Sequence, residues 1–325
     1  MQNASRLVLQ LAEAARRLDP WALTNALRAL AEHEEKKKKT GGIAEQLRRL
    51  IPHAGQDPGQ HKALKHLHER TPRLQLDDLQ LDDHVRETCD ELILEQLKAN
   101  TLAEAGLAPR NRVLLTGPPG NGKTSLAEGI ATALRRLFYS VSYDTLIGSH
   151  LGETGSRLQQ VAHYISSYEC VALLDEFETI SKERDDDDEV GEMKRIVASL
   201  LVHLEHLPPS TVIVAATNHP AMLDRATWRR FQITLELGTP GRKELTDYFE
   251  SRRRKAPRLL LDASAAAETL EGASYAEAAE FCDDVERQQV LRPKQGPEEL
   301  FRQRLARWAA SRANHPQRPE PAPHQ

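Results

Sequence analysis

The chain has 325 residues, with 44 lysines and arginines against 48 aspartates and glutamates, and a formal net charge of −4. This length is enough for one full α/β core and one or two small helical domains. A slightly acidic chain has no dominant positive field that would draw it onto nucleic acid. Its three cysteines are far apart, which argues against a disulfide framework, and no apolar run reaches membrane-spanning length. We therefore expect a soluble, cytoplasmic protein without a membrane partner.

Residues 1–52 are predicted to form a short helical domain. Leucines recur there at helical spacing: Leu7, Leu11, Leu23, Leu27 and Leu30. Such a domain can dock a partner, support oligomerisation or simply cap the core, and the sequence leaves these roles open. Residues 53–75 are rich in glycine, proline, histidine and charge, which predicts a linker.

Residues 76–238 alternate short apolar runs with helical segments, which predicts an α/β domain. The runs are Val113–Thr116, Phe138–Val141, Val171–Leu174, Val212–Ala216 and Ile233–Leu237. The first four are too continuously apolar for a sheet with one wet face, so we expect a parallel five-stranded sheet between helical layers. Residues 239–312 predict a small all-α domain, and residues 313–325, rich in Pro, His and Gln, predict a disordered tail.

A glycine-rich loop joins the first apolar run to a helical segment. It consists of Gly117, Pro118, Pro119, Gly120, Asn121, Gly122, Lys123 and Thr124, followed by Ser125. Glycines allow the backbone amides to curl around phosphate oxygens, and the following helix N-terminus favours an anion. In this P-loop pattern we expect Lys123 to reach the β- and γ-phosphates of a nucleotide and the Thr124 hydroxyl to ligate Mg²⁺.

Polar side chains end two later apolar runs. Asp175 and Glu176 follow Val171–Leu174, and Asn218 follows the run that begins at Val212. Beside a P-loop, we expect Asp175 to hold Mg²⁺ and Glu176 to polarise the attacking water. Asn218 can orient that water. A second acidic residue favours a hydrolase over a kinase.

Taken together, these segments resemble the AAA family of ATPases, over roughly residues 76–290. The run from Leu223 to Phe231 is the most specific, because it is similar to the family's second region of homology. That resemblance makes Asn218 a sensor residue and makes Arg229 and Arg230 candidate arginine fingers that reach the ATP of a neighbouring subunit. The two arginines are adjacent here, whereas the family commonly separates them by two residues, so the resemblance does not say which is the finger.

The same resemblance assigns further nucleotide contacts and an assembly. The stretch from Leu76 to Gln80, with Asp78 and Leu79, is similar to the segment whose backbone clamps the base, although its usual glycine is missing. Ala276 lies in a stretch similar to the lid segment near the adenine, where Tyr275 replaces a glycine. The resemblance implies ATP and Mg²⁺ as cofactors and a homo-oligomeric ring, a hexamer.

The substrate of the ring is the least constrained part. His150, Leu151 and Gly152 lie where the family carries its first pore loop, and residues 185–189 would place negative charge at the second. Such charge would repel nucleic acid. A protein-remodelling motor, an assembly switch with a separately encoded effector, as in small single-module bacterial AAA proteins, and a nucleic-acid motor or loader all stay open. The only basic cluster for the last is Arg252–Lys255.

Overall fold

The computed structural model describes residues 64–141, 154–177 and 205–313, with short helical pieces between residues 8 and 34. The predicted pore-loop residues His150, Leu151 and Gly152, the acidic run 185–189, the predicted tail after residue 313 and most of residues 1–52 lie outside this part of the chain. The chain divides into two compact units. The N-terminal unit contains residues 1–116 and 123–236, and the C-terminal unit contains residues 117–122 and 237–325.

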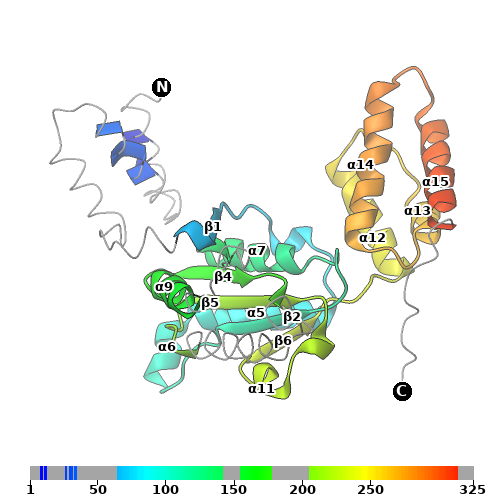
Figure 1. Ribbon diagram of the computed structural model, residues 1–325. Helices are drawn as coiled ribbons and strands as arrows, with labels where there is room; N and C mark the ends of the chain where they lie inside the picture. The colour runs from blue at the N-terminus through cyan, green and yellow to red at the C-terminus, as the bar shows by residue number, and fades with distance from the viewer. Residues whose placement is uncertain are drawn as a thin grey trace. The chain divides into compact units, whose positions relative to one another are not determined.

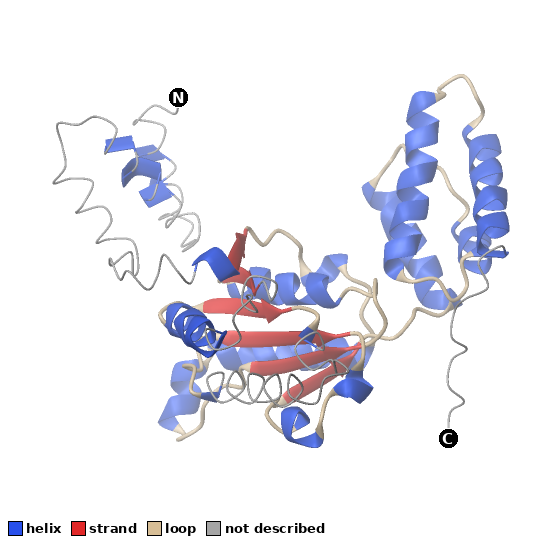
Figure 2. Ribbon diagram, viewed as in Figure 1, coloured by secondary structure: helices blue, strands red, loops and turns tan. Residues whose placement is uncertain are grey.

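A six-stranded sheet forms the centre of the N-terminal unit (Figures 1 and 2). Its order is β1-β3-β4-β5-β2-β6. The strands are β1 (Leu67–Arg70), β2 (Arg112–Thr116), β3 (Leu137–Val141), β4 (Cys170–Leu174), β5 (Val212–Thr217) and β6 (Ile233–Glu236). Strands β2 to β6 all run parallel to one another. The five parallel strands are those predicted from the apolar runs, and the predicted fold class is confirmed.

Strand β1 is an addition that the sequence pattern did not indicate. It pairs antiparallel with β3 at the edge of the sheet, with Leu67 opposite Val141. Only its first residue, Leu67, is buried, whereas His68 to Arg70 are exposed. An edge strand with one wet face and four residues has no apolar run, and this segment lies in the stretch interpreted as a linker.

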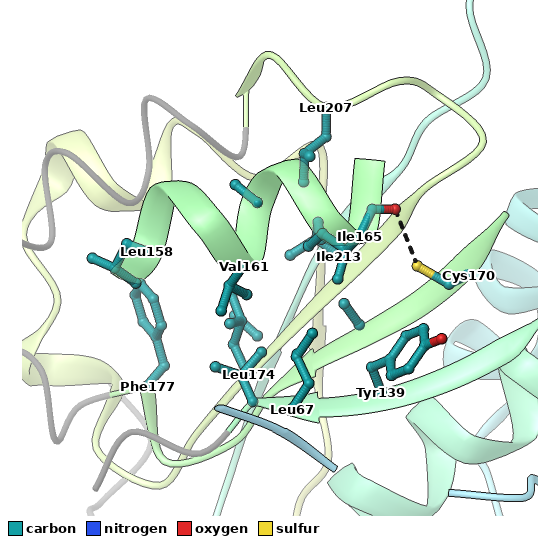
Figure 3. Packing of buried hydrophobic residues seen from close by; sticks show 14 of the residues in the cluster. Leu67, Tyr139, Leu158, Val161, Ile165, Cys170, Leu174, Phe177, Leu207 and Ile213 are labelled. Carbon is teal, nitrogen blue, oxygen red and sulfur yellow. Dashed lines mark hydrogen bonds between the residues drawn. The ribbon is translucent and has the colours of Figure 1, made fainter. Parts of the chain in front are cut away.

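Helices cover both faces of this sheet, as the alternation of buried side chains shows. Cys170, Ala172 and Leu174 of β4 belong to one apolar cluster with helix α9 (Thr154–Ser166), which Figure 3 shows through Leu158, Val161 and Ile165. The side chains between them, Val171 and Leu173, are equally buried but lie outside that cluster. Because successive strand residues point to opposite faces, these two lie on the other face, where helix α7 (Lys123–Leu134) packs against β3, β4 and β5.

Among the described residues, the remaining elements of this unit are short apart from one helix. They are η1 (Leu64–His66), η2 (Leu76–Asp78), α5 (Asp83–Leu97), α6 (Ala99–Glu104), η5 (Pro220–Met222) and α11 (Arg225–Trp228). Helix α5 packs on α7. Its start is fixed by Asp82, whose carboxylate accepts a hydrogen bond of 2.7 Å from the Val85 amide.

The described part of the C-terminal unit contains four helices, in the segment for which the sequence predicts a small all-α domain. They are α12 (Arg242–Lys255), α13 (Ala263–Thr269), α14 (Tyr275–Leu291) and α15 (Pro297–Ala313). Their core centres on Phe281, whose ring lies 6.0 Å from that of Phe249 and 5.6 Å from that of Trp308. Within the described residues, no helix is long and apolar enough to cross a membrane.

All three cysteines are free thiols buried inside the two units. Burial raises the pKa of the Cys89, Cys170 and Cys282 thiols to about 12 each. They are therefore protonated and unreactive at neutral pH. In Figure 3 the Cys170 thiol donates a hydrogen bond of 3.6 Å to the Ile165 carbonyl, which links β4 to the end of α9.

Candidate nucleotide-binding site

The carboxyl ends of three neighbouring parallel strands place the predicted polar residues along one edge of the sheet. Strand β5 lies between β4 and β2, with Leu174 of β4 opposite Ala215 and Thr116 of β2 opposite Thr217. Asp175 and Glu176 follow β4, Asn218 follows β5, and the glycine-rich loop follows β2. Open α/β sheets bind their ligands at the carboxyl ends of their strands.

The loop from Gly117 to Gly122 has the backbone that a P-loop requires. Gly117, Gly120 and Gly122 all have positive φ, of 131°, 79° and 91°. A Cβ added to Gly117 would lie 2.1 Å from the Leu237 carbonyl oxygen, so no other residue fits there. The curled backbone can therefore direct its amides at an anion.

The loop also contacts the N-terminus of helix α14 within the C-terminal unit. The Ala276 amide donates a hydrogen bond of 2.9 Å to the Gly120 carbonyl, and the Tyr275 amide donates one of 3.4 Å to Asn121 Oδ1. Ser274 and Glu277 form a capping box around the same helix start. Sequence resemblance places Ala276 beside a nucleotide, and its amide is already bonded to Gly120.

Thr124 and Asp175, the two predicted metal ligands, are in direct contact. The Thr124 hydroxyl donates a hydrogen bond of 2.7 Å to Asp175 Oδ2. Lys123, the first residue of α7, is buried and only 6% exposed, and Ser125 is half-buried in the same first turn. Among the described residues, no group of three or more His, Cys, Asp or Glu side chains is arranged to hold a metal ion. A hydroxyl, one carboxylate and phosphate oxygens form the sparse ligand set that Mg²⁺ commonly uses.

Glu176 has a conformation that a glutamate rarely adopts. Its φ is 51°, in the left-handed region, and its amide donates a hydrogen bond of 3.0 Å to Asp175 Oδ1. Its side chain is exposed, whereas the half-buried Asn218 lies at the end of the neighbouring strand. At that end the Thr217 hydroxyl oxygen accepts a hydrogen bond of 3.1 Å from the His219 amide.

The two candidate arginine fingers differ in their surroundings. Arg230 forms an ion pair of 2.6 Å with Glu205, and its carbonyl accepts a hydrogen bond of 2.8 Å from Arg112 Nε. Arg229 is exposed, and its guanidinium has no hydrogen-bonding or ionic partner among the residues that the structure describes. Neither Glu205 nor Arg112 is indicated by any sequence pattern, because both are distant from Arg230 along the chain.

The helix before the two arginines is firmly capped. Asp224 accepts a hydrogen bond of 2.6 Å from the Thr227 amide at the start of α11. That hydrogen bond holds the pKa of the Asp224 carboxyl below its usual value. The cap fixes where the helix starts, and the last residue of α11, Trp228, directly precedes Arg229.

The segment expected to contact a base is also ordered. The Asp78 and Leu79 amides donate hydrogen bonds of 3.0 and 3.1 Å to the carbonyls of Gln75 and Leu76. The Asp78 carboxylate accepts a further hydrogen bond of 3.0 Å from the Gln75 amide. Both amides are thus used within η2, and the segment presents its side chains and carbonyl oxygens.

Comparison with known proteins identifies the family. Residues 113–239 match the ATPase family associated with various cellular activities (AAA). A protein named uncharacterized AAA family ATPase y4kL, from Sinorhizobium fredii strain NBRC 101917 / NGR234, is 33% identical over 223 residues, which is 68% of this chain and 67% of that protein.

Two other relatives match over a smaller share of their length. A putative 26S proteasome regulatory subunit homologue from Methanocaldococcus jannaschii is 35% identical over 46% of this chain and 41% of its own. The peroxisomal ATPase PEX6 of Saccharomyces cerevisiae is 33% identical over 52% of this chain and 17% of its own.

The fold agrees with this assignment. The crystal structure of the FIGL-1 AAA domain in complex with ADP has a TM-score of 0.59 and 20% identity, and the match covers 76% of this chain and 87% of that one. The chain belongs to the AAA family of ATPases.

Proposed function

We propose that this ATPase hydrolyses ATP with Mg²⁺ bound beside Thr124 and Asp175. The observation that carries the proposal is the 2.7 Å contact between their oxygens. Adjacent ligands of an octahedral Mg²⁺ at 2.0–2.1 Å lie ~2.9 Å apart, so this pair fits the ion with little movement. When bound, the ion neutralises negative charge on the phosphates.

The remaining groups divide the work of binding ATP. The amides of Gly117–Gly122 and the buried ammonium of Lys123 hold the phosphates, with Ser125 behind them in α7. Asp78 and Leu79 contact the base through the backbone of η2. Because the Ala276 amide bonds to Gly120, Ala276 would meet the adenine through its methyl group.

Hydrolysis itself falls to the two residues at the ends of β4 and β5. Glu176 acts as general base on the attacking water, and the amide of Asn218 orients that water towards the γ-phosphate. The tight turn at Asp175 and Glu176 supports this division, because it holds Asp175 in contact with Thr124 while Glu176 stays exposed.

The site is completed by a neighbouring subunit in a homo-oligomeric ring, for which we propose six subunits. Arg229 is the residue delivered in trans, because its guanidinium is exposed, whereas that of Arg230 is occupied by Glu205. Arg230 then holds the loop in place. An arginine supplied in trans stabilises charge on the transferring phosphate.

The ring acts on a protein client. The relative named as a proteasome regulatory subunit homologue favours this class of substrate. The basic cluster that a nucleic-acid motor would need is partly neutralised, since Arg252 pairs with Asp283 at 2.5 Å. His150, Leu151 and Gly152 remain the expected contacts with the client.

The experiment that tests this function measures ATP hydrolysis with and without Mg²⁺, and with added unfolded protein, single-stranded DNA or RNA. We expect turnover that requires Mg²⁺ and rises with unfolded protein alone. Stimulation by nucleic acid instead would indicate a motor on DNA or RNA. A Mg²⁺-dependent activity that no polymer changes would favour an assembly switch that recruits a separate effector.

A further inference from the structure

Helix α7 directly follows the phosphate loop in sequence. It also contacts a second segment, residues 73–76, which leads into η2. Oε1 of Glu128, in the second turn of α7, accepts a hydrogen bond of 2.9 Å from the Arg73 amide and one of 3.2 Å from the Leu74 amide. Residues 71–75 have no regular secondary structure, so no strand or helix ladder satisfies these amides. One carboxylate oxygen therefore fixes the path of the chain into η2.

The next residue of α7 provides a second attachment. A Cβ added to Gly129 would lie 2.8 Å from Leu76 Cδ2, and Leu76 is only 7% exposed. Glycine inside a helix costs about 1 kcal/mol relative to alanine. Here it opens a space in which the first residue of η2 packs directly on the helix.

A third attachment comes from helix α5. Arg86 donates a hydrogen bond of 2.8 Å to the Leu76 carbonyl and one of 3.1 Å to Asp77 Oδ1. Residues 73–77 are thus held by two helices, α7 and α5. Two of the three residues that hold them, Glu128 and Gly129, are consecutive in α7.

We propose that Glu128 and Gly129 are positioning residues for base recognition. The inference rests on the proposed function, in which Lys123 and Thr124 hold the phosphates and Asp78 and Leu79 contact the base. Thr124 and Glu128 are four residues apart on one rigid helix, about 6 Å along its axis. Helix α7 therefore sets the spacing between the phosphate end and the base end of the nucleotide.

The chemistry of η2 also defines which base this arrangement selects. The Asp78 and Leu79 amides are bonded to Gln75 and Leu76, so the backbone offers acceptors to a base. A carbonyl has two lone pairs and can accept from the amino group of adenine. Guanine carries the acceptor O6 at the corresponding position and would be repelled. A correctly placed η2 should therefore favour adenine nucleotides.

The test compares the affinities of the full chain for ADP, GDP and pyrophosphate by calorimetric titration. Glu128→Ala should weaken ADP binding roughly tenfold and reduce the preference for ADP over GDP, because both amides lose their acceptor. Pyrophosphate binding should stay unchanged. Glu128→Gln keeps an oxygen that can accept both hydrogen bonds, so it should bind ADP nearly as the wild type does. Gly129→Ala, which displaces Leu76, should repeat the effect of Glu128→Ala.

Arg135→Ala, an exposed change at the end of the same helix, is the matched control and should bind all three ligands as the wild type does. An equal loss of ADP and pyrophosphate affinity in Glu128→Ala, or no loss of either in both variants, would overturn the positioning role. If the wild type bound none of the three ligands, the proposed function itself would fail, and this result is distinct from the other two. Melting curves identify a variant that has not folded, and the remaining variant then decides.

Discussion

At the scale of single residues, the backbone of Glu176 is the clearest mark of function. A side chain other than glycine at a φ of 51° carries strain, which costs on the order of 1–3 kcal/mol and collects at active sites. The carboxylate of Asp175 stabilises this turn through the Glu176 amide. The strained turn separates two adjacent carboxylates, one in contact with Thr124 and one exposed.

We predict that Glu176→Gln binds ATP but hydrolyses it at least ~100-fold more slowly. The amide keeps the shape of the side chain and cannot take a proton from water. Filter binding and phosphate release measure the two properties. Lys123→Ala is the companion variant and should lose ATP affinity itself. Turnover of Glu176→Gln near the wild-type rate would assign the base to another residue.

Most of these residues could be predicted from the sequence, but their contacts and exposure could not. The motif spacing predicts that Thr124 and Asp175 share a metal; the structure shows the two side chains hydrogen-bonded, and their role as metal ligands stays a prediction. The sequence alone does not distinguish Arg229 from Arg230, because they are the same amino acid at neighbouring positions. Only the pairing of Arg230 with Glu205, which depends on how distant segments fold together, separates them.

At the scale of elements, prediction depended on how completely a segment is buried. The strand β4 is buried at all five positions and reads as an unbroken apolar run. The edge strand β1 is buried at one position and has no such signal. Gly129 is a similar case. In the sequence, a glycine within a helical segment indicates only a less stable helix. Its packing partner, Leu76, is remote in the chain and is known only from the structure.

A paired carboxylate on α14 gives a prediction for the helical unit. Arg304 of α15 donates two hydrogen bonds of 2.8 Å to Asp284, and these lower the pKa of Asp284 from its ordinary 3.8. The pair stabilises the folded state above pH 3.8 and loses its effect below it, as the pH falls through the lower pKa of Asp284 in the folded state. Asp284→Asn should therefore destabilise the α14–α15 pair by about 1–2 kcal/mol at pH 7. Hydrogen exchange in these helices measures the change.

The control for this prediction is the neighbouring carboxylate. Asp283 pairs with Arg252, but its side chain is 54% exposed, so Asp283→Asn should cost well under 1 kcal/mol. The difference between Asp284→Asn and wild type should shrink as the pH falls below 3.8, through the lowered pKa of Asp284. A difference that stays constant over this range would show that the charge of Asp284 contributes nothing.

At the scale of the whole molecule, the proposed function assigns one catalytic group to a neighbouring chain. Among the described residues, the guanidinium of Arg229 has no partner, although it is exposed directly after the capped helix α11. In an ion pair, the charge of an arginine is neutralised by its partner. A catalytic arginine must instead keep its guanidinium available for the nucleotide bound by the neighbouring subunit. The exposure of Arg229 and the engagement of Arg230 with Glu205 are what the proposed ring, in which each subunit completes the next, requires.

We predict that Arg229→Ala lowers ATP turnover by ~10³-fold or more while ATP binding is kept, because the trans charge on the transferring phosphate is lost. Arg230→Ala should cost far less, since its ion pair with Glu205 is partly exposed. Mixed with Glu176→Gln protein, which lacks the base but keeps its arginine, Arg229→Ala protein should regain activity, since the neighbour's intact arginine completes its site. The control is Arg229→Ala protein mixed with a Glu176→Gln/Arg229→Ala double variant, which supplies neither group, and this mixture should stay inactive. No recovery of activity in the first mixture, together with a specific activity that does not change on dilution, would place the whole active site within a single chain.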